Sequence, residues 1–137
     1  MVSGYWPGVS LLQTPFTALG VPWLLNPLIG GATILVMHRL ALALFDDVDS
    51  AGYVVLLTVA SPAVTINALS YYAMPAHLLA SALYLLLLLH PTPRRALLAG
   101  LVGSLALALH NPVPHILFAL PWIAWLAFRP DRVRILS

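Results

Sequence analysis

The sequence predicts an all-α membrane protein: a polytopic bundle of about five transmembrane helices with an N-terminal interfacial segment. Three observations predict this fold class. Hydrophobic residues make up 61% of the 137 residues and charged residues only 7%, whereas soluble domains carry about 25% charged residues. Proline and glycine divide the apolar sequence into helix-sized runs. The basic residues, all arginine, fall at the ends of these runs.

The same composition excludes several classes of protein. Because the chain has no cysteine, it forms neither disulfides nor zinc–thiolate sites. The formal net charge of +2 comes from arginines placed as in membrane topology, so no nucleic-acid partner is predicted. No glycine-rich phosphate loop is present, and no basic region precedes the first apolar run as it would in a secretory signal peptide.

Residues 1–23 are predicted to form an interfacial segment on the outward side. This segment is apolar, but proline and glycine interrupt it, so its longest run is too short to cross a bilayer. A short helix over residues 9–19 is expected to lie on the membrane surface. Tyr5, Trp6 and Trp23 would be its aromatic anchors.

Residues 24–129 are predicted to form the bundle, and residues 130–137 a cytoplasmic tail. The five expected spans are residues 27–45, 52–69, 74–90, 95–110 and 115–129. Pro62 lies within the second span and predicts a bend there, with Thr58, Ser61 or a neighbouring helix satisfying the carbonyl that proline leaves free.

The third span carries the strongest insertion signal, because eight leucines lie between positions 78 and 89. Together they favour insertion by about 4 kcal/mol. Its apolar run is short for a ~30 Å hydrocarbon core. A second possibility is therefore a helix that begins near Ser70 and kinks at Pro75.

Local signals predict helix ends and contacts. Asn26 and Pro27 read as an N-cap followed by a first-turn proline. Asp49 or Ser50 is expected to cap the second span. In the fourth span, four small residues share one face and are expected to pack against other helices: Ala96, Gly100, Ser104 and Ala108.

The arginines predict the orientation. Five alternating helices place all of them on one side: Arg39, Arg94, Arg95, Arg129, Arg132 and Arg134. The positive-inside rule makes that side cytoplasmic, with the N-terminus outside and the C-terminus inside. Because a chain that begins outside without a signal peptide is unusual, we expect an upstream membrane helix to be missing.

Polar and aromatic side chains gather at the predicted outward turns and are the candidate substrate-binding residues: Tyr5, Trp6, Tyr71, His77, His110, Asn111 and His115. Polar groups in or near a membrane are costly, so this concentration predicts contacts with a phosphate or a sugar at the lipid surface. Two other interpretations stay open. The residues could simply favour the interface, or three histidines could bind a metal, although their spacing matches no metal motif and no metal ligand is assigned.

Four motifs follow one another in an order that resembles a known family. They are Tyr5-Trp6-Pro7-Gly8, Asn26-Pro27-Leu28, Ala60-Ser61-Pro62, and Ser70-Tyr71 with His77. In this order the chain resembles the middle of bacterial polytopic glycosyltransferases of the family-39, dolichyl-phosphate-mannose-mannosyltransferase-like type, in the GT-C superfamily. The resemblance implies an enzyme of the bacterial inner membrane that transfers a sugar from a polyprenyl-phosphate donor at the outer face.

Sugar transfer of this kind needs a general base. The acidic residues are all predicted to be cytoplasmic: Asp46, Asp47, Asp49 and Asp131. No catalytic residue is therefore assigned, and the resemblance implies that the base lies in the missing upstream part of the same enzyme. The expected partners are the lipid bilayer and the polyprenyl-phosphate sugar donor, and the cofactor is left open. The alternative function is a non-enzymatic membrane scaffold or transport module.

Overall fold

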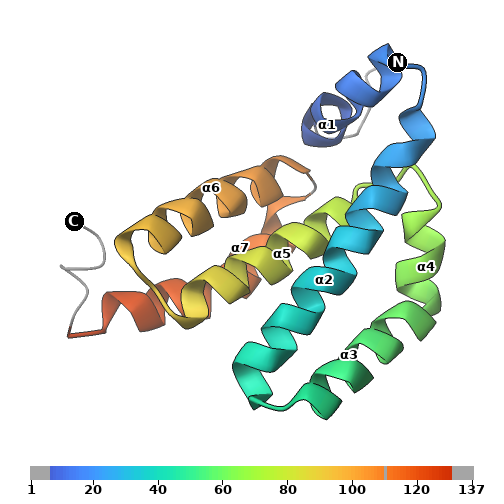
Figure 1. The fold of residues 1–137 in the computed structure, drawn as a ribbon. Coiled ribbons are helices and arrows are strands. Elements are labelled where there is room, and N and C mark those ends of the chain that lie inside the picture. Colours follow the sequence, from blue (N-terminus) through green and yellow to red (C-terminus); the bar gives the residue numbers. More distant parts are fainter. Residues whose placement is uncertain (1–6, 110, 131–137) are drawn as a thin grey trace.

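The computed structural model describes residues 7–109 and 111–130, and all regular structure in these ranges is helical (Figure 1). The elements are α1 (Pro7–Ala18), a 3-10 turn η1 (Pro22–Leu24), α2 (Leu25–Phe45), α3 (Val48–Ala60), α4 (Pro62–Ala68), α5 (Met74–Leu89), α6 (Pro93–Leu109) and α7 (Pro112–Ala127). The all-α prediction is confirmed. The tail 131–137 lies outside the described residues.

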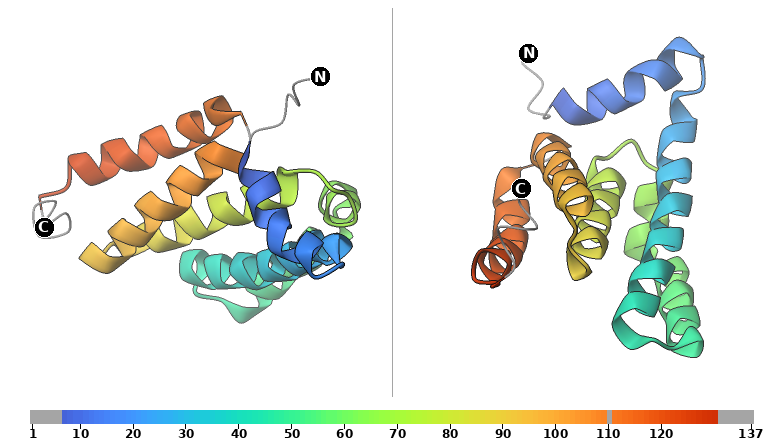
Figure 2. Two further views of the ribbon diagram at one scale, coloured as in Figure 1. Left: turned by 90° about the horizontal axis from the view of Figure 1, so that it is seen from above. Right: turned by 60° about the vertical axis from the view of Figure 1, so that its left-hand side comes forward.

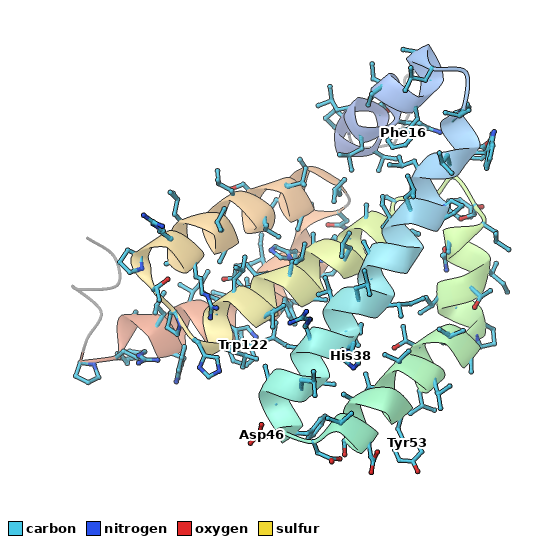
Figure 3. All side chains as sticks on the ribbon, in the orientation of Figure 1. Phe16, His38, Asp46, Tyr53 and Trp122 are labelled. Atoms are coloured by element: carbon cyan, nitrogen blue, oxygen red, sulfur yellow. The ribbon has the colours of Figure 1, made fainter. Side chains whose placement is uncertain are left out.

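Helix α5 is the centre of the arrangement, because it packs against α2 on one side and α6 on the other. Helices α3 and α4 complete the group around α2, and α7 lies beside α6 (Figure 1, Figure 2). We call the end of the molecule that holds α1, the turn of residues 69–73 and the start of α7 the α1 end. The opposite end, with the α2–α3 and α5–α6 turns, is the charged end. Figure 3 shows Asp46 and Tyr53 there, far from Phe16 of α1.

The lengths of the helices bear on the predicted five spans. One helical stretch, Pro22–Phe45, is long and apolar enough to cross a membrane, and α3 with α4 makes a second if the bent pair is one span. Helices α5 and α7 are apolar but have 16 residues each, or about 24 Å at 1.5 Å per residue. Length and composition therefore support one or two spans.

Large apolar side chains are exposed on every helix from α2 to α7. Examples are Leu35, Leu57, Ile66, Leu78, Leu97 and Leu117. Water-soluble monomers rarely expose contiguous apolar surface on this scale. Burial inside the molecule falls instead on small residues, since most of its buried apolar residues are alanines. Small residues let helix backbones approach closely, as in membrane proteins.

Helix α1 lies across the α1 end of the molecule and reaches from α2 to the end of α6 (Figure 2). Gly8 makes its closest approach: a Cβ atom at this position would lie 2.6 Å from the carbonyl oxygen of Ala108. Val9 and Leu12 then pack against a buried cluster of α5 and α6. A short helix is therefore present as predicted, but it covers residues 7–18 instead of 9–19.

The second predicted span is broken between Ser61 and Pro62, where α3 and α4 meet at 60°. The predicted bend is therefore present, but neither predicted side chain stabilises it. The hydroxyl of Thr65 donates to the carbonyl of Val59 at 2.9 Å and to that of Ser61 at 3.1 Å. Thr58 instead bonds one turn back, to Val54. Helix α5 begins at Met74 with Pro75 in its first turn, so the alternative with a kink at Pro75 is wrong.

Helices α3, α6 and α7 begin earlier than predicted, and a side chain just before each of them accepts from an N–H of its first turn. Asp47, rather than Asp49 or Ser50, is the N-cap of α3, and its carboxylate accepts from the Ser50 N–H at 2.7 Å. The Asn111 side chain caps α7 by accepting from the Val113 N–H at 3.1 Å. At α6, the hydroxyl of Thr92 accepts from the Arg95 N–H at 3.3 Å.

Asn26 does not cap α2, because the helix begins one residue earlier, at Leu25. Its buried side chain donates to the carbonyls of Ser70 and Tyr72, the second at 3.1 Å. A single amide group thus ties the start of α2 to the turn before α5. Without it, two carbonyls at this contact would lose their donor.

Replacing Asn26 with alanine is expected to lower the free energy of unfolding by about 1–3 kcal/mol, because two hydrogen bonds at a buried contact are lost. Asn67→Ala is the matched control. Its amide bonds only to Ala63, one turn back in the same helix, so its effect should stay within ~0.5 kcal/mol. Unfolding of the two variants in detergent measures the difference. Equal loss in both variants would contradict the role given to Asn26.

The Asp47 cap predicts a pH dependence. Hydrogen bonds from Ser50 lower the pKa of the Asp47 carboxyl. Its ionised form therefore stabilises the fold above the unfolded pKa of about 3.9, and this contribution is lost as the pH falls through the lower folded pKa. Asp47→Ala should lower the thermal midpoint at pH 7. The difference in thermal midpoint between this variant and wild type should become smaller near pH 3. Asp47→Ser keeps a capping oxygen without the charge, so it should retain most of the stability at pH 7. If the difference in thermal midpoint between Asp47→Ala and wild type is the same at both pH values, Asp47 is not the charged N-cap of α3.

Candidate functional site

The structure places the predicted site residues in different surroundings. Tyr71 lies in the 69–73 turn and is 61% exposed. Asn111 is exposed and serves as the α7 cap. His77 on α5 is half-buried, and His115 on α7 is only 2% exposed. Three further predicted residues lie outside the described residues: Tyr5, Trp6 and His110.

His77 and His115 come together inside the molecule. Their ring centroids are 5.7 Å apart and the rings meet edge to face, at 86°. The Tyr84 ring lies on the other side of His115, with 5.5 Å between centroids. Phe118 completes the group at 6.2 Å from His115. We call these four residues the histidine–tyrosine cluster.

Helix periodicity explains how the cluster is built. His77 and Tyr84 are seven residues apart on α5, which places them on one face two turns apart. His115 and Phe118 are three apart on α7 and also share a face. Gly103 of α6 gives the rings room: a Cβ atom there would lie 3.3 Å from the Tyr84 ring and 3.5 Å from Nε2 of His115.

His115 is the unusual member of the cluster. Its Nδ1 atom is buried, and no described residue forms a hydrogen bond with it. An unsatisfied buried polar atom costs about 1–3 kcal/mol, and such atoms are rare in folded proteins. A ligand group that bonds to this nitrogen would remove that cost.

A groove of about 320 Å³ opens beside His115 between α5, α6 and α7. Three side chains with polar atoms line it: His115 and Ser104, which lie toward the α1 end, and Tyr84 in the middle of α5. Ser104 donates its hydroxyl to the Gly100 carbonyl at 2.9 Å, which leaves its oxygen able to accept. The rest of the lining is apolar and runs toward the charged end: Ala96, Ala99, Ile116, Ala119, Leu120, Ile123 and Leu126 among others. The groove therefore has two polar side chains near the α1 end and is mostly apolar along the rest of its length.

The predicted packing face of α6, with Gly100 and Ser104 against other helices, is wrong. Gly100 and Ser104 are exposed, and a Cβ atom on Gly100 would meet nothing within 4 Å. The face that packs against α5 and α7 is instead that of Ala99, Gly103, Ala106 and Leu109. Ala96, Gly100 and Ser104 form one wall of the groove.

A second groove, of about 380 Å³, lies on the other side of α5, against α2 and α4. His77 lines it together with Thr33, Asn67 and Ser81. The two histidines thus stand between two grooves. Within ranges 7–109 and 111–130, no three potential metal-ligating side chains come together.

Sequence reasoning missed Tyr84, Gly103 and Ser104 as site residues. The signal for Tyr84 was its position two turns after His77 in a run of leucines. Gly103 gave a weaker signal, because a glycine in a span more often marks a helix contact than a site.

Gly103→Leu is expected to lower the free energy of unfolding by about 1–3 kcal/mol, since the added side chain would overlap Tyr84 and His115. Gly100→Leu, three residues earlier on the same helix, enters open space and should be tolerated. Thermal unfolding in detergent compares the pair. A Gly100 variant that is as unstable as the Gly103 variant would refute the packing described for α6.

Comparison with known proteins leaves the site to be interpreted from its own chemistry. No family model matches the chain, and neither does a curated protein or a solved structure. The resemblance noted from the sequence consequently rests on its motifs alone. In the structure three of the four motifs lie at the start of α2, at the α3–α4 break and at the entry into α5, and the described part of the first, Pro7 and Gly8, lies at the start of α1.

Proposed function

We propose that the chain is a five-span membrane bundle that binds a polyprenyl-phosphate sugar and forms the lipid-donor side of a glycosyltransferase. In this proposal α2, the α3–α4 pair, α5, α6 and α7 cross the membrane, with the α1 end outward and the charged end cytoplasmic. Helices of 16 residues are shorter than a ~30 Å hydrocarbon core. They would be accommodated by local thinning of the bilayer or by packing against longer helices.

The observation that supports lipid binding best is the shape and polarity of the α5–α6–α7 groove. An amphiphile needs an apolar channel for its chain and hydrogen-bonding groups at one end for its head. The groove has an apolar lining along most of its length and His115 and Ser104 near the α1 end. His115 lines this end of the groove, and an imidazole nitrogen can accept from a hydroxyl or, when protonated, donate to a phosphate oxygen.

The charges agree with this orientation. Asp46, Asp47, Arg94 and Arg95 lie in or beside the turns of the charged end, as the positive-inside rule requires of the arginines. The described carboxylates are therefore far from His115. A carboxylate that acts as general base at this end would have to come from outside the described residues, and we do not expect the chain to transfer sugar unaided.

Lipid binding can be tested with two glycine variants. Gly100→Leu would fill the groove, whereas Gly31→Leu adds the same side chain on exposed α2, where a Cβ atom also meets nothing within 4 Å. Native mass spectrometry in detergent, with added polyprenyl phosphate, counts the bound lipid. We expect lipid binding by wild type and the Gly31 variant and at least tenfold weaker binding by the Gly100 variant, or about 1.4 kcal/mol.

A second comparison tests the role of His115. His115→Phe keeps an aromatic ring and removes both nitrogens. It should weaken binding of polyprenyl phosphate more than that of the uncharged polyprenol, because only the former presents a phosphate to the imidazole. In the glycine comparison, equal binding of polyprenyl phosphate by wild type and the Gly100→Leu variant would exclude this groove as the lipid site.

A transport module is the second candidate function, and one observation favours it. The break between α3 and α4 resembles the discontinuous helices that line substrate paths in transporters. It borders the groove that holds Thr33, Asn67 and His77. Uptake of a solute by proteoliposomes, without any bound lipid, would favour this alternative.

A further inference from the structure

A different surface lies at the α1 end, between α1 and the 69–73 turn. A hollow of about 540 Å³ opens there, lined by Val9, Ser10, Gln13, Ser70, Tyr71, Tyr72 and Ala73. A smaller hollow of about 50 Å³ adjoins it and shares Val9, Gln13, Ser70 and Tyr71, with Trp23 and Asn26 on its far side. The larger volume lies within the range of about 300–1,000 Å³ that is usual for small-molecule sites.

The chemistry of the larger hollow is polar and uncharged. None of the described residues that line it carries a charge. Gln13 offers an amide, Ser10 a hydroxyl, and Tyr71 and Tyr72 two phenols. Within the described part of the chain these four polar groups make no hydrogen bonds with one another or with other residues. They are available to a ligand, as donors and as acceptors.

The tyrosine-bearing wall of the hollow is held in place. Asn26 bonds to the carbonyls of Ser70 and Tyr72. The hydroxyl of Ser70 donates to the Asn67 carbonyl at 2.8 Å and accepts from the Tyr72 N–H at 3.4 Å. Four hydrogen bonds thus fix a turn of a few residues. A fixed wall reduces the entropy lost when a ligand binds.

We infer that this hollow is a binding site for a neutral saccharide. A sugar offers hydroxyls that both donate and accept, which suits an amide, a serine and two phenols, and its C–H faces pack on aromatic rings. An anion would find no cation to pair with here. A purely apolar ligand would bury four polar groups without partners, which is costly.

This site goes beyond the proposed lipid binding, because it is built from other elements than the α5–α6–α7 groove. Gln13 and Ser10 are on α1, and the tyrosines are in the turn before α5. An experiment can therefore disprove saccharide binding without disproving lipid binding, and the reverse is also true.

Saturation-transfer NMR of the chain in lipid nanodiscs tests the inference, since nanodiscs avoid sugar-headed detergents. The neutral probes are methyl β-D-glucopyranoside, methyl α-D-mannopyranoside and N-acetylglucosamine. The charged probes are glucuronate and glucose 1-phosphate. We expect at least one neutral probe to bind more strongly than both charged probes.

Variants on α1 and in the turn locate the binding. Gln13→Leu and Tyr71→Phe should each weaken the neutral probe about three- to tenfold, as expected for one lost hydrogen bond. Thr17→Val removes a hydroxyl from α1 outside the hollow and should bind as wild type does, as should Gly100→Leu. Tyr71→Phe removes one exposed oxygen, so it keeps the test valid if the Gln13 variant does not fold. No saturation transfer from any neutral probe, equal binding by Tyr71→Phe and Thr17→Val, or stronger binding of the charged probes would overturn the inference.

Discussion

The close approach of α5 to α2 on one side and α6 on the other is the constraint on which the rest of the structure depends. Ala76 and Ala80 of α5 meet Ala106 and Leu109 of α6 in one buried cluster. The three alanines of this cluster are small enough to let the backbones come near for extensive dispersion contact. The exception is Tyr84, whose ring fits because Gly103 faces it without a side chain. That accommodation also places the ring against His115 and so creates the cluster at the candidate site.

The helices themselves could be predicted from the sequence, because apolar runs and the prolines between them are local signals. Their caps could not all be predicted. Asp47 and Asp49 are two residues apart, and both can reach a backbone N–H at the start of α3. Only the extended backbone at position 47 decides that Asp47 is the cap. Asn26 is a harder case, since its partners are 44 and 46 residues away and nothing near it in the sequence indicates them.

The candidate site shows the same limit. Histidines near the predicted outward turns were visible in the sequence, but their meeting depends on how α5 and α7 pack. The small residues of α6 form two overlapping patterns at helical spacing. One contains Ala96, Gly100 and Ser104, and the other contains Ala99 and Gly103. Periodicity alone cannot say which pattern packs and which stays open, because both satisfy the same rule for close helix contact. The structure packs the second and leaves the first as a groove wall.

The chemistry of His115 gives the strongest reason to regard that groove as more than a gap between helices. Phenylalanine would fill much of the same space beside Tyr84 and Phe118 without a polar atom. Burying an imidazole whose Nδ1 forms no hydrogen bond costs free energy, and the packing contacts of the ring do not offset this cost. A purely apolar chain in the groove would leave this cost unchanged. Only an occupant whose hydrogen-bonding group reached Nδ1 would remove it, and the proposed amphiphilic lipid has such a group together with an apolar remainder.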